Sequence, residues 1–439
     1  MIVEGGATIE SRTLWRLGSG DNSHGSLTVR GAGSSVTTGQ INLGAIQFPV
    51  TGGTGSLLVE NGGHLHSQSF HSLIGFGADT TGSATVRGDG SKWLLERDGQ
   101  YGRVRVLSGS LLIEDGGTVI GAGGDVGAIP GRTAVAIVRG AGSTWINHDY
   151  LVVGEDSWQV GARGRVDVES AGRIDVGQTL NVSRQGTLAV TTGGAVSVGS
   201  LPPEQDLHEL EGDRVHVWED GRVVGRGDID VAELRSVGRV QPGSFGADDP
   251  PGTLSLAGHY QQQASGTLEI AITDDTHSQL AVDGEAVLAG TLEVAWAGED
   301  EAELLGQAVI VLTASAILGR FDDVRAAGRD DLYFDVAYAS QAVTVTSGLI
   351  GDMNGDGVVD TGDVAPFVLA LTDPAAYEAQ YGIDPALVGD INQDGSFDTG
   401  DVAAFVQLLV NSDSAIPEPG SLALLGLGGL MVLRRQRAP

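Results

Sequence analysis

The sequence of 439 residues contains no cysteine. It can therefore form no disulfide, no thiolate metal site and no iron–sulfur cluster, and it has no cysteine nucleophile. Basic residues are also scarce, because 25 lysines and arginines stand against 57 aspartates and glutamates, a formal net charge of −32. Binding of nucleic-acid phosphates needs a basic surface, so this charge argues against a nucleic-acid partner. An oxidising compartment is not excluded, since an exported protein can simply lack thiols.

Aromatic residues make up only 5% of the chain, whereas glycine occurs 69 times. The glycines follow no strict Gly-X-Y period, which excludes a collagen triple helix. Hydrophobic residues make up 41%, too large a share for a disordered chain. The length predicts about three folded parts.

Two interleaved motifs repeat through residues 1–200. The motif Val-Arg-Gly-x-Gly-Ser begins at Val29, Val86 and Val138. The motif Val/Ile-Glu-x-Gly-Gly begins at Val59 and Ile113, with related copies at Val3 and Val168. Both motifs recur about every 55 residues. Two independent motifs with one period indicate a true structural repeat.

Short runs such as 164–169 alternate apolar with polar residues, and Gly-Gly or Asp-Gly pairs separate them. This pattern predicts half-buried strands joined by turns. A unit of this size cannot bury its own apolar face, so the units must stack, and each would supply two or three coils of roughly 20–25 residues. We expect an all-β fold, a β-solenoid of the right-handed parallel β-helix type. An array of β-sandwiches is the second interpretation.

Residues 201–349 are expected to finish or cap the β-solenoid. Residues 201–204, Leu-Pro-Pro-Glu, indicate a joint, after which strand-like runs resume. An open solenoid end needs a polar cap that prevents edge pairing. The acidic run 299–303 is interpreted as a solvated loop.

Two aromatic or basic groups within the repeats allow alternative interpretations. Trp93 and Trp145 share the repeat position of Val36, which predicts a stack in the core; exposed rings that stack on sugars are the alternative. His64 and His66 would share one face of a strand near His71, so a metal pair is conceivable. Because other repeats carry unrelated residues there, a variable exposed position is favoured.

Two twelve-residue segments, 352–363 and 390–401, fit the loop of an EF-hand at positions 1, 3, 5, 6, 9 and 12. Ca²⁺ prefers six to eight hard oxygen ligands, and a wrapped loop brings alternate side chains to one point. The carboxylates in each loop repel one another without a cation, so metal binding should couple to folding. Aspartate replaces the usual glutamate at position 12.

The predicted Ca²⁺ ligands are side-chain oxygens, except for one main-chain carbonyl at position 7 of each loop. In the first loop they are Asp352, Asn354, Asp356, Val358, Asp360 and Asp363. In the second loop they are Asp390, Asn392, Asp394, Ser396, Asp398 and Asp401. Gly357 and Gly395 would form the sharp turns, and Val359 and Phe397 would point inward.

A duplicated loop followed by an apolar helix, without the helix that precedes an EF-hand loop, resembles a type I dockerin over residues 350–411. The resemblance implies a small all-α calcium-binding domain that binds a cohesin-like partner. In that family, loop positions 10 and 11 help to select the cohesin; here they are Thr361-Gly362 and Thr399-Gly400. A calcium-stiffened spacer without a partner is the alternative interpretation.

Residues 412–439 have the organisation of a sorting signal. Pro417-Glu418-Pro419 precedes an apolar run of about 13 residues from Ser421 to Leu433, and arginines follow. The run is shorter than the roughly 18 residues of a confident membrane span. This organisation resembles the PEP-CTERM signal, which implies a C-terminal apolar helix held transiently in the inner membrane, processing by an exosortase and delivery outside the cell. A plain tail anchor is the alternative.

The repeat motifs of residues 1–200 also resemble those of autotransporter and PEP-CTERM-associated proteins, and residues 241–243 and 259–262 resemble the end of a passenger-type β-helix. We therefore expect an exported, non-catalytic structural or adhesive protein at the cell surface, with a polysaccharide or extracellular matrix among its partners. The alternative is a polysaccharide-active β-helix enzyme, a lyase or glycoside hydrolase, although the net charge would repel polyanionic substrates. Because Met1 stands inside a repeat without a signal peptide, we expect a misassigned start or a fragment.

Overall fold

The computed structural model describes residues 1–20, 22–45, 52–77, 80–154, 161–199, 214–243, 250–296 and 305–412. The chain divides into two compact units. The first consists of Met1–Glu299, Val309–Gly328 and Val336–Val345. The second consists of Asp300–Ala308, Arg329–Asp335 and Thr346–Pro439. The predicted joint at 201–204, the acidic run at 299–303 and the tail from 413 onward lie outside the described residues.

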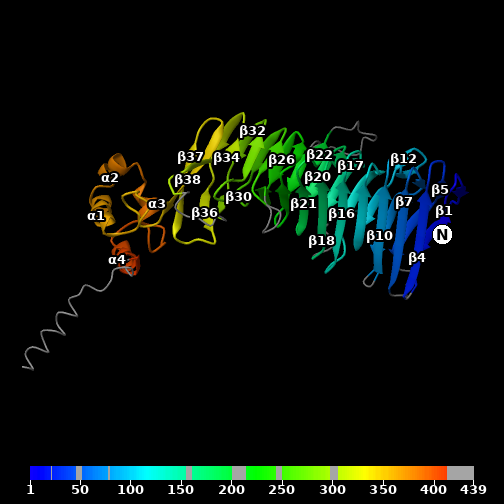
Figure 1. Ribbon diagram of the computed structural model, residues 1–439, viewed down its shortest axis with the longest axis horizontal. Coiled ribbons are helices and arrows are strands. Elements are labelled where there is room, and N and C mark those ends of the chain that lie inside the picture. The colour runs from blue at the N-terminus through cyan, green and yellow to red at the C-terminus, as the bar shows by residue number, and fades with distance from the viewer. Residues whose placement is uncertain are drawn as a thin grey trace, which may run out of the picture. The chain divides into compact units, whose positions relative to one another are not determined.

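The first unit is a stack of parallel β-coils, and its strands follow one another in chain order from β1 onward in Figure 1. One coil consists of β7 (Gly53–Glu60), β8 (His64–Ser67) and β9 (His71–Phe76). Each of these strands pairs in parallel with a strand of the preceding coil and a strand of the following coil. The predicted β-solenoid with parallel strands is therefore confirmed, while its right-handed sense stays a prediction.

Within the described residues, 13 strands form the first sheet. They are β1 (Ile2–Val3), β4 (Ser23–Arg30), β7, β10 (Thr80–Arg87), β14 (Gly109–Glu114), β16 (Thr133–Arg139), β18 (Arg163–Glu169), β21 (Gly186–Val190), β24 (Arg222–Gly225), β27 (Arg239–Pro242), β30 (Thr267–Ile272), β33 (Thr291–Trp296) and β36 (Asp323–Ala327).

The other 25 strands that the structure describes form a second sheet with two rows, because the long strands β15 and β17 belong to both rows. They are β2 (Thr8–Glu10), β3 (Leu14–Leu17), β5 (Ser35–Thr38), β6 (Gln40–Ala45), β8, β9, β11 (Lys92–Arg97), β12 (Gln100–Tyr101), β13 (Arg103–Val106), β15 (Thr118–Val126), β17 (Thr144–Val153), β19 (Arg173–Val176), β20 (Thr179–Val182), β22 (Ala195–Val198), β23 (Arg214–Val217), β25 (Asp228–Asp230), β26 (Glu233–Ser236), β28 (Thr253–Leu256), β29 (His259–Gln262), β31 (Gln279–Val282), β32 (Glu285–Leu288), β34 (Ala308–Thr313), β35 (Ala316–Gly319), β37 (Leu332–Tyr338) and β38 (Ala342–Leu349).

The two sequence motifs occupy alternate coils. Val29 pairs in register with Val59, Val59 with Val86, and Val86 with Ile113. The repeat of about 55 residues therefore contains two coils, one for each motif. Of the two or three coils predicted for each repeat, the structure confirms two. The same parallel pairing continues through β24, β27, β30, β33 and β36, so solenoid coils extend into the segment expected to form the end of the solenoid.

Contacts between the two motifs explain why their glycines and serines recur. The Gly62 N–H donates a hydrogen bond of 3.0 Å to the Ser91 Oγ of the next coil. Gly117 lies so close to the preceding coil that a Cβ there would stand 2.2 Å from the Val86 carbonyl oxygen. The hydrogen bond recurs between Gly116 and Ser143. The close approach to a carbonyl oxygen recurs between Gly63 and Val29 and between Gly172 and Val138.

The interior of the coils is filled by the inward-facing residues of the alternating runs. Along β10, for example, buried residues alternate with partly or fully exposed ones. Trp93 and Trp145 are both fully buried, and Trp93 lies in register with Leu65 and Val36. The predicted core stack is therefore confirmed, and the alternative of exposed sugar-stacking tryptophans is wrong. The Trp93 indole N–H donates to Ser67 Oγ at 3.0 Å.

A ladder of alternating charges runs along the outside of the first seven coils. The strand register places Glu4, Arg30, Glu60, Arg87, Glu114, Arg139 and Glu169 at equivalent positions of consecutive coils. Arg87 donates to Glu60 at 2.6 Å and Arg139 to Glu114 at 2.7 Å. Because the arginines are about half exposed, each pair contributes only about 0.2–1 kcal/mol. Like charges in adjacent coils would instead repel.

The second unit includes four short α-helices among the described residues: α1 (Val364–Thr372), α2 (Pro374–Tyr381), α3 (Pro385–Gly389) and α4 (Asp401–Ser412). A 3₁₀ turn, η2 (Thr361–Asp363), precedes α1. Asp373 and Asp384 cap α2 and α3 by accepting from backbone N–H groups, each followed by proline at the first helical position. This Asp-Pro pattern is a typical helix start.

We predict that Gly117→Ala destabilises the solenoid by about 1–3 kcal/mol, because the added methyl group would overlap the Val86 carbonyl oxygen. Chemical unfolding of the full chain measures the change. The control is Gly20→Ala, whose Cβ would meet Ser23 Oγ at an ordinary 3.6 Å. Equal effects of the two substitutions would contradict the close packing of successive coils.

Candidate metal-binding site in the paired loops

Each of the two predicted calcium loops leads into a helix of the second unit. The first loop follows β38 and leads through η2 into α1. The second follows the five-residue helix α3 and leads into α4. The helices predicted after each loop are therefore confirmed. The absence of a preceding helix is confirmed for the first loop, whereas the short α3 stands before the second.

The first and last aspartates of each loop hold the backbone closed. Asp352 Oδ1 accepts from the Gly355 N–H at 2.8 Å, and its Oδ2 accepts from the Gly357 N–H at 2.8 Å. Asp363 accepts from Asn354 N and from Asp360 N, each at 2.9 Å. The carboxylates at positions 1 and 12 are thereby tied to one closed turn of backbone.

The second loop repeats most of these closing hydrogen bonds. Asp390 Oδ2 accepts from Gly395 N at 2.9 Å, as Asp352 does from Gly357. Asp401 accepts from Asn392 N at 3.0 Å and from Asp398 N at 2.9 Å. The carboxylates at positions 1 and 12 therefore close both loops in the same way.

The middle positions of the loops also match. In the first loop Asn354 donates to Asp356 Oδ2 at 2.9 Å, and in the second Asn392 donates to Asp394 Oδ2 at 3.0 Å. At position 9, Asp360 and Asp398 each accept from the N–H two residues later at 2.6 Å.

At position 6, Gly357 and Gly395 have φ values of +87° and +88°. Residues with a side chain rarely adopt this backbone conformation, so both turns favour glycine, as the sequence predicts.

Burial gives the loop carboxylates an unfavourable environment for charge. Asp352 is 5% exposed and Asp363 is fully buried, and burial raises the pKa of both carboxyl groups. A raised pKa means that the fold favours the protonated carboxyl group over the ionised one. The protonated groups therefore stabilise the fold in acid, and this contribution is lost as the pH rises through the folded-state pKa. At neutral pH a neighbouring cation would offset this effect.

The surrounding sequence supplies no such cation from a side chain. Residues 350–412 contain eleven aspartates and glutamates and no lysine, arginine or histidine. The donor set of oxygens from carboxylates, amides and carbonyls suits a hard divalent ion. In the part of the chain that the structure describes, no three acidic or imidazole side chains are grouped so that they could hold a metal ion as they stand. Calcium binding therefore stays a prediction.

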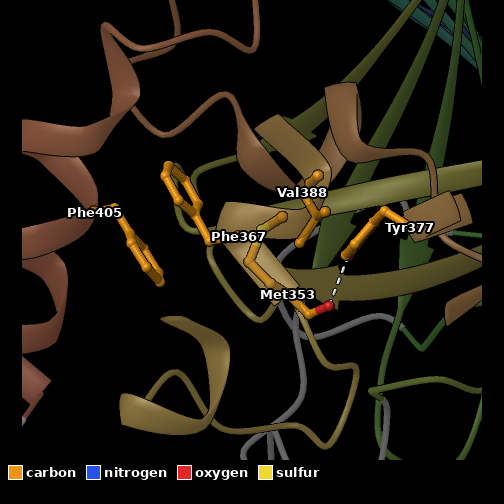
Figure 2. Close-up of a cluster of buried hydrophobic side chains, with 6 residues drawn as sticks. Met353, Phe367, Tyr377, Val388 and Phe405 are labelled. Atoms are coloured by element: carbon orange, nitrogen blue, oxygen red, sulfur yellow. Dashed lines mark hydrogen bonds between the residues drawn. The ribbon is translucent and has the colours of Figure 1, made fainter. Parts of the chain in front are cut away.

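A small aromatic core joins the two loops and their helices (Figure 2). Phe367 of α1 stacks on Phe405 of α4, with ring centroids 4.2 Å apart and planes at 9°. The Tyr377 hydroxyl donates to the Met353 carbonyl at 2.7 Å, so α2 is tied to the first loop. Phe397, at position 8 of the second loop, packs against the same core. The inward direction predicted for Phe397 is confirmed.

Each of the helices that follow the loops carries exposed valines at a spacing of four residues, which places them on one helix face. They are Val364 and Val368 on α1, and Val402, Val406 and Val410 on α4. The residues at loop positions 10 and 11, 361–362 and 399–400, are also exposed. Sequence reasoning treated these valines only as part of an apolar stretch; their period of four, repeated 38 residues later, was the available signal.

The other candidate sites of the repeats do not assemble into a metal or catalytic centre within the described coils. The ring nitrogens of His64 and His66 contact carbonyl oxygens of Gly90 and Glu96 at 3.1 Å and 3.0 Å. Several aspartates of the coils are instead paired with arginine: Asp125 with Arg105, Asp167 with Arg165, and Asp175 with Arg173.

Comparison with known families gives one match. Residues 415–438 match the PEP-CTERM protein-sorting motif, in the segment predicted to be a sorting signal. The motif indicates an exported surface protein that is processed by an exosortase. No curated protein matches the chain. Among the helices that the structure describes, none is long and apolar enough to cross a membrane.

Proposed function

We propose that this chain is a non-catalytic structural or adhesive protein of the cell surface, whose β-solenoid presents a regular exterior and whose paired loops form a calcium-dependent interaction domain. The observation that carries the proposal is the PEP-CTERM motif on a chain built mainly of stacked parallel coils. In this proposal the apolar segment 421–433 anchors the chain in the inner membrane only until the exosortase acts. The resemblance of the repeats to autotransporter passengers supports the same role.

The proposed calcium ligands are those of the two loops, at positions 1, 3, 5, 7, 9 and 12. Asp352, Asn354, Asp356, Val358, Asp360 and Asp363 would hold one ion. Asp390, Asn392, Asp394, Ser396, Asp398 and Asp401 would hold the other. The support lies in the matched hydrogen bonds of the two loops, the buried carboxylates and the absence of basic residues from 350–412. When bound, calcium would supply the positive charge that this segment lacks.

The exposed valines of α1 and α4 support a dockerin-like role for residues 350–411. Two copies of one apolar helix face, each beginning beside loop positions 10 and 11, suit a cohesin-like partner that binds either copy. A spacer would not require these valines to be exposed at a spacing of four. Calcium would set the orientation of both helices, because each begins where a loop ends.

The enzyme alternative has no specific support. A lyase on this scaffold would need clustered carboxylates beside an unpaired cationic base. Asp125, Asp167 and Asp175 each lie in an ion pair with arginine on the outer face of the coils. We therefore propose no reaction.

For export, we predict that the surface-associated form in the native cell lacks the apolar tail. Mass spectrometry of the surface fraction should detect peptides from the solenoid and from 350–411 but none from 421–439. A deletion of residues 415–439 should lose surface association, since the sorting motif is removed. Recovery of the intact chain from the cytosol alone would contradict the proposal.

For calcium, we predict that the full chain binds two ions and that binding raises the unfolding temperature of the paired-loop segment. Asp363→Asn with Asp401→Asn should weaken binding at least about tenfold, because each substitution removes a charged ligand. Titration calorimetry and circular dichroism in chelator and in calcium measure both effects. Asp373→Asn with Asp384→Asn is the matched control, since it removes two charges outside the ligand set and keeps two good helix caps. Equal effects of the two pairs would contradict the assignment.

For docking, we predict that Val368→Asp with Val406→Asp abolishes calcium-dependent binding of a cohesin-like partner without changing calcium affinity. Charges on both copies of the apolar face would have to be desolvated in the complex. Binding is measured by surface plasmon resonance against cohesins from the same organism. Ala375→Asp, on the exposed first turn of α2, is the control for added charge. Unchanged binding by the valine variant would exclude this face.

A further inference from the structure

A hollow of about 440 Å³ lies on the outer surface of the first four solenoid coils. It lies at the corner between the two strand rows of the second sheet, beside β3, β6, β9 and β11. Its volume falls within the range of small-ligand sites, roughly 300–1,000 Å³. The side chains that the argument uses are Arg12, Gln40, Gln68, Phe70, Arg97 and Asp98.

One side of the hollow is built by a feature specific to the fourth coil. Strand β11 continues to Arg97, turns at Asp98-Gly99 and pairs back antiparallel with β12. In the preceding three coils the corresponding strands are joined by short corners at 11–13, 39 and 68–70. The hairpin places the Arg97 guanidinium carbon 5.3 Å from the centroid of the Phe70 ring. A guanidinium stacked on a ring is restrained, and its N–H groups remain available to a planar anion.

The charge of the hollow is opposite to that of the chain. Within the described residues, the exposed Arg12 guanidinium has no hydrogen bond or ion pair. Besides its stacking on Phe70, Arg97 forms an ion pair with the exposed Asp98 at 3.5 Å. The hollow is therefore lined by two arginines and one carboxylate, although acids outnumber bases 57 to 25 in the whole chain.

The remaining groups suit a sugar. Phe70 is 53% exposed, which leaves ring surface for the apolar face of a pyranose. The amide group of Gln68 can donate to and accept from hydroxyl groups; that of Gln40 already donates to Asn42 Oδ1 at 2.9 Å and keeps its oxygen and its second N–H for a ligand. Guanidinium groups bind carboxylates through paired hydrogen bonds.

We propose that this hollow binds an acidic oligosaccharide, with its carboxylates on Arg12 and Arg97 and a sugar ring against Phe70. The inference rests on the proposed surface role, since such glycans occur outside the cell. The net charge of −32 does not prevent such binding. Salt screens charges that lie more than roughly 10 Å away, so the arginines of the hollow determine the electrostatic field that the ligand experiences.

The test uses the purified full chain and titration calorimetry with a tetrasaccharide of uronic acids. The matched probe is the tetrasaccharide of the corresponding neutral sugar, which differs only in its carboxylates. We expect the acidic probe to bind at least about tenfold more tightly, and its affinity to decrease with salt. Arg12→Ala and Arg97→Ala should each weaken the acidic probe about tenfold, and Phe70→Ala should weaken both probes.

Arg163→Ala is the control for lost positive charge, because Arg163 is exposed in a later coil and bonds to Gln185 at 3.2 Å. It should leave the affinity unchanged. Equal affinity for the acidic and neutral probes, unchanged binding by the Arg12 and Arg97 variants, or tighter binding of single-stranded DNA than of the acidic probe would overturn the proposal.

The titration is carried out in chelator, so it does not depend on the calcium loops. A failure of binding with intact calcium uptake and surface delivery would refute this site and leave the proposed function standing. Binding of the acidic probe by a chain that stays in the cytosol would support this site and refute the proposed function.

Discussion

The close approach of successive coil backbones determines the rest of the solenoid. At Gly63, Gly117 and Gly172 no side chain fits beneath the carbonyl of the preceding coil. With that contact in place, the parallel ladders keep one register, and each residue of a motif lies above its counterpart. The register in turn places Trp93 in the core and aligns the arginines with the glutamates. A displacement by one residue would expose the core residues, because neighbouring side chains along a strand face opposite sides.

Repulsion between the many carboxylates is reduced in different ways in the two units. On the early coils, acids lie next to arginines of the adjacent coil, which reduces repulsion without metal. Residues 350–412 contain no basic side chain, and their carboxylates close the loops by accepting backbone N–H groups instead. These bonds satisfy the oxygens but leave the net charge uncompensated. The proposed calcium ions would complete the neutralisation, whereas the hollow at Phe70 has an excess of positive charge.

Much of the fold could be predicted from the sequence because repetition carries the information. The period, the alternation in 164–169 and the shared position of Trp93, Trp145 and Val36 predicted stacked coils with tryptophan inside. The loop pattern also placed the sharp turns at Gly357 and Gly395. The ladder residues are the second residues of the repeated motifs, but their pairing follows only once the two motifs are known to occupy successive coils. The hollow could not be found in this way, because it depends on which residues outside the motifs lie side by side. Phe70 and Arg97 lie outside the repeated motifs, and Arg97 lies against Phe70 where β11 turns into the hairpin at 97–100.

The alternation of charge along the early coils also constrains how such a protein can change its length. Loss of one coil, or its duplication, would place two arginines or two glutamates side by side and would separate a serine from its glycine partner. Loss or duplication of two consecutive coils preserves every neighbour. The natural increment of growth for this part of the chain is therefore a pair of coils, which matches the 55-residue step of the sequence. Recombination between gene copies would yield a folded product most readily when it respects that step.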